Sequence, residues 1–245
     1  MNNTGAAEDI IWAIFYLIEG SKECLEELMD IINQKYIVNL ISSNNETMQA
    51  VALRIIGEAC IASNVYAQDF IAVDCLSSLQ EIIKSPNSNN KNFACLVLGN
   101  IAIGNTAQIQ MLINKGVIKD TINLIERTSD NSIREEAFHI IANACVEGND
   151  MQVWQLVSQG VLKVLVQMLG SKNLSILLKA LKVVERLLKM DESDDRMAVQ
   201  WQDIGGVEAM EKLEEHCSGE VYEEVVRILN AYYTVEESEQ GLIKD

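Results

Sequence analysis

Apolar residues recur at helical spacing along the whole chain, and the pattern itself returns at a longer interval. The stretch Asn92–Gly104 is an apolar helix that holds one polar amide, Asn100, and ends at a glycine. Close copies lie at 9–20, 51–63 and 135–148, with looser ones at 178–190 and 222–233. The positions equivalent to the amide follow one another at intervals of 42 to 44 residues: Tyr16, Glu58, Asn100, Asn143, Arg186 and Asn230. The sequence therefore predicts a repeating array of helices.

Each repeat is predicted to contain three helices, as the second shows at Ser21–Asn33, Gln34–Ser43 and Asn45–Ser63. A repeat of about 42 residues is typical of armadillo and HEAT arrays. We therefore expect an all-α solenoid in which each repeat packs mainly on its neighbours. The predicted single array covers 1–245: the last helix of an incomplete repeat at 6–20, full repeats near 21–63, 64–105, 106–148, 149–190 and 191–234, and a polar acidic tail at 235–245.

Glycines mark the predicted turns between the first and second helices of several repeats. They lie at Gly116, Gly160 and the pair Gly205-Gly206, where a residue without Cβ adopts positive φ at little cost. The predicted first helix is also apolar, at Ile10, Ile11, Ile14, Phe15 and Leu17, although the ends of an array normally carry polar caps. This pattern favours a chain that continues a longer array, or a first helix that packs on another copy.

The charge of the chain is concentrated at one end. The formal net charge is −17, and residues 191–245 contribute 16 Asp/Glu against 4 Lys/Arg, a net of −12. Nucleic acid is a poor partner for such a chain, because affinity for phosphates requires clustered Lys and Arg. A basic protein partner is the natural complement. A solvated acidic end that serves only solubility is the alternative.

The remaining composition indicates a binding protein without cofactors. We expect reduced core cysteines in a cytosolic or nuclear protein, since the six show no CxxC spacing and no cluster with His. No apolar run is long enough to span a membrane, and no basic segment opens a signal peptide. His139 and His216 are isolated, and phosphate loops and nucleophile elbows are absent, so we predict neither an enzyme nor a metal site.

Several stretches resemble the armadillo repeats of importin-α, the nuclear import adaptor. They include WAIFYLIEG at Trp12–Gly20, ALRIIGEAC at Ala52–Cys60, ACLVLGNIAIG at Ala94–Gly104 and REEAFHIIANAC at Arg134–Cys145. The segments at 155–169 and 204–233 resemble the last two repeats of that family. The resemblance covers about residues 6–234, in register and in order, and corresponds to repeats five to ten, the C-terminal half.

The resemblance implies a right-handed superhelix whose third helices line a concave groove for an extended basic peptide. In that family, Trp faces hold Lys or Arg stems, Asn amides bind the peptide backbone, and nearby acids meet the cationic heads. Carried over residue by residue, the pairs of positions are Trp12/Tyr16, Arg54/Glu58, Leu96/Asn100 and His139/Asn143, with Glu136 as a nearby acid.

Three of these positions depart from the family pattern. Leu96 and His139 stand where the minor peptide site of the family has its two Trp residues, and Glu58 stands where an Asn is expected. Leu96 has no π face, so a cation–π contribution of about 0.5–2 kcal/mol is lost there. The backbone clamp would then survive while the side-chain slots are degraded.

Each of these residues also has a simpler structural interpretation. A buried Asn must be hydrogen-bonded, so Asn100 and Asn143 would serve as clasps between helices if they do not face the groove. We favour the interpretation in which both amides face the groove. Trp12 would be ordinary core, and Glu58 would form an intrahelical ion pair with Arg54. Trp154 and Trp201 fall on first helices, where we expect packing.

The resemblance implies a nuclear import adaptor that shuttles between cytoplasm and nucleus and binds Lys/Arg-rich nuclear localisation peptides of cargo proteins. The acidic last repeat would contact the export receptor of the importin-β superfamily, through Glu211, Glu214 and Glu215. Importin-β itself would bind an N-terminal region that nothing in this sequence matches. The competing hypotheses are an armadillo scaffold whose basic-peptide site is degraded and, with less support, a subunit that regulates an enzyme.

Overall fold

The computed structural model describes residues 4–86, 88–190 and 196–233, which hold sixteen helices and no strand. They form two compact units, divided between Val161 and Leu162. The first unit contains α1 Thr4–Glu19, α2 Lys22–Ile31, α3 Gln34–Ile41, α4 Glu46–Ala62, α5 Asn64–Ala72, α6 Cys75–Lys84, α7 Lys91–Ala102, α8 Thr106–Asn114, α9 Val117–Arg127, α10 Asn131–Glu147 and α11 Asp150–Ser158.

The second unit begins within α12 Val161–Met168 and continues with α13 Leu174–Met190, α14 Arg196–Asp203, α15 Gly206–His216 and α16 Glu220–Tyr232. The three helices predicted at 21–33, 34–43 and 45–63 correspond to α2, α3 and α4, within two residues at each end. The predicted tail at 235–245 and part of the loop before α14 lie outside the described residues.

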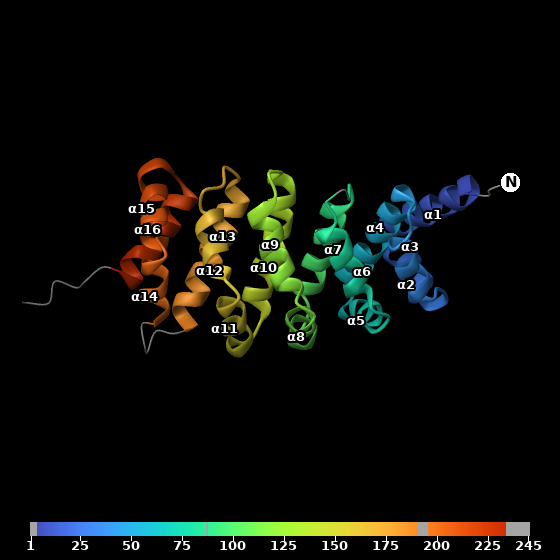
Figure 1. Ribbon diagram of the computed structural model, residues 1–245, viewed down its shortest axis with the longest axis horizontal. Helices are drawn as coiled ribbons and strands as arrows, with labels where there is room; N and C mark the ends of the chain where they lie inside the picture. The colour runs from blue at the N-terminus through green and yellow to red at the C-terminus, as the bar shows by residue number, and fades with distance from the viewer. Residues whose placement is uncertain (1–3, 87, 191–195, 234–245) are drawn as a thin grey trace, which may run out of the picture. The chain divides into compact units, whose positions relative to one another are not determined.

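Third helices of successive repeats form a continuous column in the first unit. The helix α4 packs on α1 and α7, and α7 packs on α10. In Figure 1 the first helices α5, α8 and α11 follow one another along one edge of this unit. The core beside this column is aliphatic, because the third helices bury runs such as Val51–Leu53 and Ile140–Ala142 almost completely. This arrangement places the predicted groove positions on neighbouring helices.

Polar side chains cap the N-termini of several of these helices. Asn45 accepts from the backbone N–H of Met48 at 3.1 Å, and Asn105 accepts from that of Gln108 at 3.0 Å. Each such cap satisfies a backbone donor that the first turn of a helix leaves unpaired. The glycine turns are also confirmed, since Gly116, Gly160 and Gly205 have φ of 76°, 106° and 82°.

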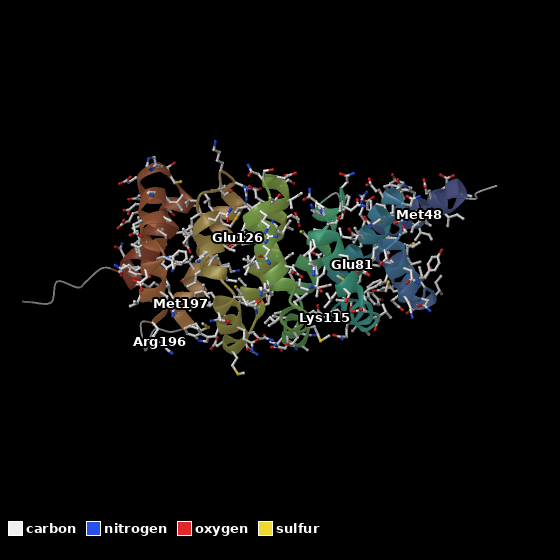
Figure 2. The ribbon with its side chains drawn as sticks, viewed as in Figure 1. Met48, Glu81, Lys115, Glu126, Arg196 and Met197 are labelled. Atoms are coloured by element: carbon white, nitrogen blue, oxygen red, sulfur yellow. The ribbon has the colours of Figure 1, made fainter. Side chains whose placement is uncertain are left out.

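The equivalent turn of the second full repeat uses a residue that is not glycine. Asp74 stands there with φ 64°. Its carboxylate accepts from Lys115 Nζ at 2.8 Å and from Ser77 Oγ at 2.9 Å, and the bond from Lys115 lowers the pKa of Asp74. Lys115 lies at the turn between α8 and α9 and is labelled in Figure 2. A contact with the next repeat therefore accompanies the left-handed backbone at Asp74.

The second unit packs its own apolar core. The helix α13 packs on α14 and α16, and α15 packs on α14 and α16. Trp201 is only 1% exposed, and its ring lies so close to Gly206 that a Cβ there would fall 2.2 Å from it. Trp201 is thus a packing residue, as predicted, and Trp154 in the first unit is half-buried.

No disulfide joins the cysteines of the described residues. Four of them, in α4, α6, α7 and α10, are buried: Cys60, Cys75, Cys95 and Cys145. Burial raises the pKa of Cys75 and of Cys95 to about 12. These thiols are therefore protonated at neutral pH and pack as small apolar groups.

Candidate peptide-binding surface

An aromatic cluster on α1 lies at the start of the predicted groove. Trp12 and Tyr16, one turn apart, stack with ring centroids 5.6 Å apart and planes 25° from parallel. Phe15 lies beneath them, 1% exposed, with its ring edge-on to Trp12 at 6.0 Å. Trp12 is half-buried and Tyr16 is 65% exposed. The pair thus presents an aromatic face to solvent while Phe15 anchors it in the core.

Arg54 of α4 lies against this cluster. Its guanidinium carbon is 4.1 Å from the centroid of the Phe15 ring and 5.9 Å from that of Trp12. Phe93 of α7 lies on another side, with its centroid also at 5.9 Å. Cation–π attraction holds such a guanidinium over aromatic faces. Three successive third helices therefore meet at one arginine.

The charge of Arg54 is paired across repeats and not along its own helix. Its Nη2 lies 3.4 Å from Oε1 of Glu19, at the end of α1. The expected intrahelical ion pair with Glu58 is wrong, because stacking on the rings of α1 turns the guanidinium toward Glu19. Glu58 itself is half-buried one turn further along α4. Sequence analysis missed Glu19 as a site residue, although its place three residues after Tyr16 puts both on one helix face.

The two asparagines of the predicted clamp bond to the preceding helix. Asn100 Nδ2 donates to the carbonyl oxygen of Gly57 at 3.1 Å, and Asn143 Nδ2 donates to that of Gly99 at 3.0 Å. Asn100 is only 8% exposed, whereas Asn143 is half-buried. The favoured expectation of an open groove amide is therefore corrected for Asn100, which acts as a clasp between α4 and α7.

Each of the two asparagines bonds to a glycine of the preceding third helix. A Cβ on Gly57 would lie 3.8 Å from Asn100 Nδ2, and one on Gly99 would lie 4.0 Å from Asn143 Nδ2. These are ordinary van der Waals distances, so an alanine would fit at either position, and only a side chain that extends beyond Cβ would press on the amide. The carbonyl of Gly99 thus accepts a hydrogen bond from the next repeat, and the adjacent Asn100 donates one to the previous repeat.

The departures from the family pattern lie on the same column of helices. Leu96 is 38% exposed on α7, and His139 is half-buried on α10, where its Cβ lies 3.9 Å from the point a Cβ on Gly99 would occupy. Glu136 is half-buried one turn before His139, near enough to Cys95 for its charge to contribute to the raised pKa of that thiol. The structure therefore places His139 and Glu136 at the junction of α7 and α10, while Leu96 is exposed on α7.

The acidic residues predicted for the last repeat lie on α15 of the second unit. Glu211 and Glu215 are exposed, and Glu214 is half-buried. Lys212 is exposed on the same helix, so the acidic face carries one basic residue.

Across residues 4–86, 88–190 and 196–233, no group of three or more His, Cys, Asp or Glu side chains is arranged to hold a metal ion. No helix in those ranges is long and apolar enough to cross a membrane.

The sequence was compared with protein-family models, and none matches. Among curated proteins, it is 27% identical to importin subunit alpha-4 of Arabidopsis thaliana, over 99% of this chain and 47% of the relative. It is 30% identical to importin subunit alpha-1a of Oryza sativa subsp. japonica, over 97% of this chain and 47% of the relative. The chain thus spans about half the length of the curated relatives it matches, corresponding to a C-terminal half.

Solved structures with the same fold include designed armadillo-repeat proteins. One, described as a designed armadillo repeat protein in complex with the peptide (KR)4, has a TM-score of 0.79 at 24% identity and covers 93% of this chain and 92% of its own. Another, computationally designed for modular peptide recognition, has a TM-score of 0.82 at 23% identity, over 92% and 93%. At these identities the similarity establishes the fold, an armadillo-repeat solenoid. The chain is thus similar to importin-α subunits over nearly its whole length, and its fold is that of an armadillo-repeat solenoid.

Proposed function

We propose that the third helices α1, α4, α7 and α10 bind an extended Lys/Arg-rich peptide of the kind that serves as a nuclear localisation signal in cargo proteins. The chain would then act as part of a nuclear import adaptor that shuttles between cytoplasm and nucleus, with a binding role and no catalysis. The relation to importin-α subunits supports this proposal. The neighbour described with a bound (KR)4 peptide supports the same chemistry on this fold.

One observation carries the proposal: the surface between α1 and α4 already holds an arginine. The guanidinium of Arg54 rests on the Phe15 ring beside Trp12 and points to the carboxylate of Glu19. Aromatic faces for the stem and a carboxylate for the head are what a basic peptide side chain needs. A peptide cation beside Trp12 and Tyr16 would extend this arrangement into solvent, where Tyr16 is exposed.

The competing function is an armadillo scaffold that has kept the shape and lost the basic-peptide site. The burial of Asn100 favours it, because that amide is committed to the Gly57 carbonyl. Leu96 favours it as well, since an exposed aliphatic chain offers no π face to a cation.

Titration of a fluorescent peptide with two basic clusters, against a scrambled peptide of equal charge, distinguishes the two functions. The measurement is fluorescence polarisation at low salt and near physiological salt, where the Debye length is about 8 Å. The adaptor predicts that the ordered peptide binds better at both salts. Trp12→Ala should then weaken binding by about 0.5–2 kcal/mol, the value of a lost cation–π contact.

Two further variants make the result specific. Leu96→Trp with His139→Trp restores the side chains of the family pattern and should tighten binding of the ordered peptide. Met151→Ala, at a 76% exposed position on α11, is the control and should change nothing. Equal binding of both peptides, lost together near physiological salt, would mean that only the acidic surface attracts them, and the scaffold would stand.

The contacts of the acidic end belong to the same proposal. The exposed Glu211 and Glu215 of α15, with Glu214 beside them, would meet the export receptor of the importin-β superfamily. Reversal of these three charges to Lys should abolish capture of that receptor. Unchanged capture would remove the second unit from this role. Importin-β would bind through an N-terminal region that is not part of this sequence.

A further inference from the structure

Two pockets of the first unit are copies of one site, separated by one repeat. The first lies between α3 and α6 and has a volume of about 290 Å³; the second lies between α6 and α9 and has a volume of about 560 Å³. Adding 42 to the residue numbers of the first gives most residues of the second. Comparison of the two therefore separates what the fold requires at this site from what each pocket has acquired.

The second pocket has gained positive charge at three of the shared positions. Ser42, Gln49 and Ser85 of the first pocket correspond to Lys84, Lys91 and Arg127 of the second. The first pocket carries only acidic charges, from Glu46 and Glu81. We call the second, lined by Lys84, Lys91, Asp120 and Arg127 with Ile83, Pro86, Asn123, Leu124 and Thr128, the basic pocket.

One of the three cations is already balanced, and the other two are not. Lys84 Nζ lies 3.0 Å from Oδ2 of Asp120, an ion pair that takes the place of the hydrogen bond between Ser42 and Ser78 in the first pocket. Asp120 also accepts from Gln80 Nε2 at 2.6 Å. Within the described residues, Lys91 has only a long hydrogen bond to the Pro86 carbonyl, at 3.4 Å, and neither Lys91 nor Arg127 has a carboxylate partner.

This charge runs against that of the whole chain. At a formal net charge of −17, cations gathered in one pocket attract an anion only at short range, because salt screens the surrounding acids beyond about a Debye length. A nucleic acid requires a long row of phosphate contacts and would meet the acidic surface on either side. A short acidic peptide places its carboxylates on the cations and ends within the pocket.

The remaining lining fits such a ligand. Asn123 is half-buried and offers amide donors to a carboxylate, while Leu124 and Ile83 provide apolar surface for side-chain stems. The volume of about 560 Å³ is within the range of ligand pockets. The groove positions Leu96 and Asn100 do not line this pocket, so it is separate from the proposed basic-peptide surface.

We propose that the basic pocket between α6 and α9 binds an Asp/Glu-rich peptide segment of a partner protein. Carboxylates of the segment pair with Lys91 and Arg127, and Lys84 contributes while it remains paired with Asp120. The chain then carries two peptide sites of opposite preference, one on its third helices and one at the edge formed by its second helices.

The test replaces the three cations of the basic pocket with the uncharged residues at the equivalent positions of the first pocket. The triple variant Lys84→Ser, Lys91→Gln, Arg127→Ser introduces the residues that stand at 42, 49 and 85. A fluorescent Asp/Glu-rich peptide is titrated into the intact chain, and the triple variant should bind it roughly tenfold or more weakly, as expected for lost charge pairs at an interface. Asp120→Asn removes the competing carboxylate and keeps an acceptor for Gln80, so it should tighten binding. Misfolding would not produce such a gain.

A second triple variant controls for net charge. Lys35→Ser, Lys119→Ser and Lys172→Ser remove the same charge from exposed positions outside the pocket and should leave the affinity nearly unchanged. Equal weakening by both triple variants would overturn the proposal, as would tighter binding of a single-stranded oligonucleotide of equal charge. Self-association that disappears in the pocket variant, without peptide binding, would instead assign the pocket to a second copy and likewise overturn it.

Discussion

A side-chain amide has two N–H donors and one acceptor oxygen, and the asparagines of the third helices use them in different surroundings. Asn100 and Asn143 each give one N–H to a carbonyl of the preceding repeat. Burial differs: Asn100 is enclosed, while Asn143 is half-buried. At equivalent positions, the same residue type therefore serves packing in one repeat and remains closer to the surface in the next.

This difference predicts separate effects of two substitutions. Asn100→Ala should lower the free energy of unfolding by about 1–2 kcal/mol, because a buried hydrogen bond and its packing are lost. Asn143→Ala should instead weaken binding of the ordered basic peptide, at a smaller cost in stability. Urea unfolding and peptide titration of both variants measure this, with Asn114→Ala at an exposed position as control. Equal losses of stability and binding in both variants would contradict the division of roles.

At the scale of helices, local pattern predicted the elements, and contacts between repeats decided the site. Apolar spacing and glycine turns were sufficient to predict three helices in each repeat. These local signals could not reveal that Asp74 adopts the left-handed conformation of a glycine turn, because Lys115, its ion-pair partner, belongs to the next repeat. They also could not reveal that Arg54 pairs with Glu19, for the same reason. Periodicity within one helix contains no information about partners one repeat away.

First helices are joined by a glutamine that is both cap and connector. Gln108 is fully buried; its Oε1 accepts from the backbone N–H of Asn105 at 3.0 Å, and its Nε2 donates to the carbonyl of Asn64 at 2.7 Å. Gln152 has the same arrangement in the next repeat, where its amide N–H donates to the carbonyl of Thr106. One side chain therefore completes a capping box and links the starts of two adjacent helices.

Removal of this link should be costly. Gln108→Ala removes the buried amide that bonds the N–H of Asn105 and the carbonyl of Asn64, and we expect a loss of about 1–3 kcal/mol in the free energy of unfolding. Chemical denaturation followed by circular dichroism gives the value. Gln68→Ala, on the exposed side of α5, is the matched control and should stay close to the parent chain. A similar result for both variants would show that the buried bonds contribute little.

In the second unit, α13 and α16 are joined by a charged link. Glu185 of α13 accepts from Arg227 Nη1 at 2.7 Å and also pairs with Lys189, and Arg227 bonds Glu224 on its own helix. The hydrogen bond from Arg227 lowers the pKa of Glu185 to about 2. The folded pKa is depressed, so the stabilisation is complete above the ordinary pKa of about 4.5 and is lost as the pH falls toward about 2.

Glu185→Gln should therefore matter at neutral pH and cease to matter in acid. We expect the variant to melt below the parent chain at neutral pH, with the gap closing as the pH falls below about 4.5 toward about 2. Thermal melting of both proteins over this range provides the test. Glu223→Gln, exposed on α16, should show no such dependence. A gap that is constant with pH would mean that the charge of Glu185 does not stabilise the fold.

For the whole molecule, charge and contact act on different steps of binding. The acidic excess is long-ranged and sequence-independent, with −12 of the net −17 carried by residues 191–245. Rings and amides act only at contact. The field of the chain thus speeds the approach of any basic peptide, while the order of residues in the peptide governs how long it stays.

Salt should separate these two steps. The association rate of a basic peptide should fall as ionic strength rises, for ordered and scrambled sequences alike. The dissociation rate should remain slower for the ordered peptide at every salt. Stopped-flow fluorescence measures both rates. A salt-dependent dissociation rate that is equal for the two peptides would show that contact residues confer no selectivity.

The paired pockets between second helices have a consequence for how such a chain diversifies. Each pocket lies between two adjacent repeats. Three substitutions among its lining residues can therefore change the sign of its charge without touching the aliphatic core or the other pocket. Duplication provides many equivalent rims, and each drifts under its own selection. A solenoid of this kind can exchange partners one rim at a time while every earlier partner remains bound.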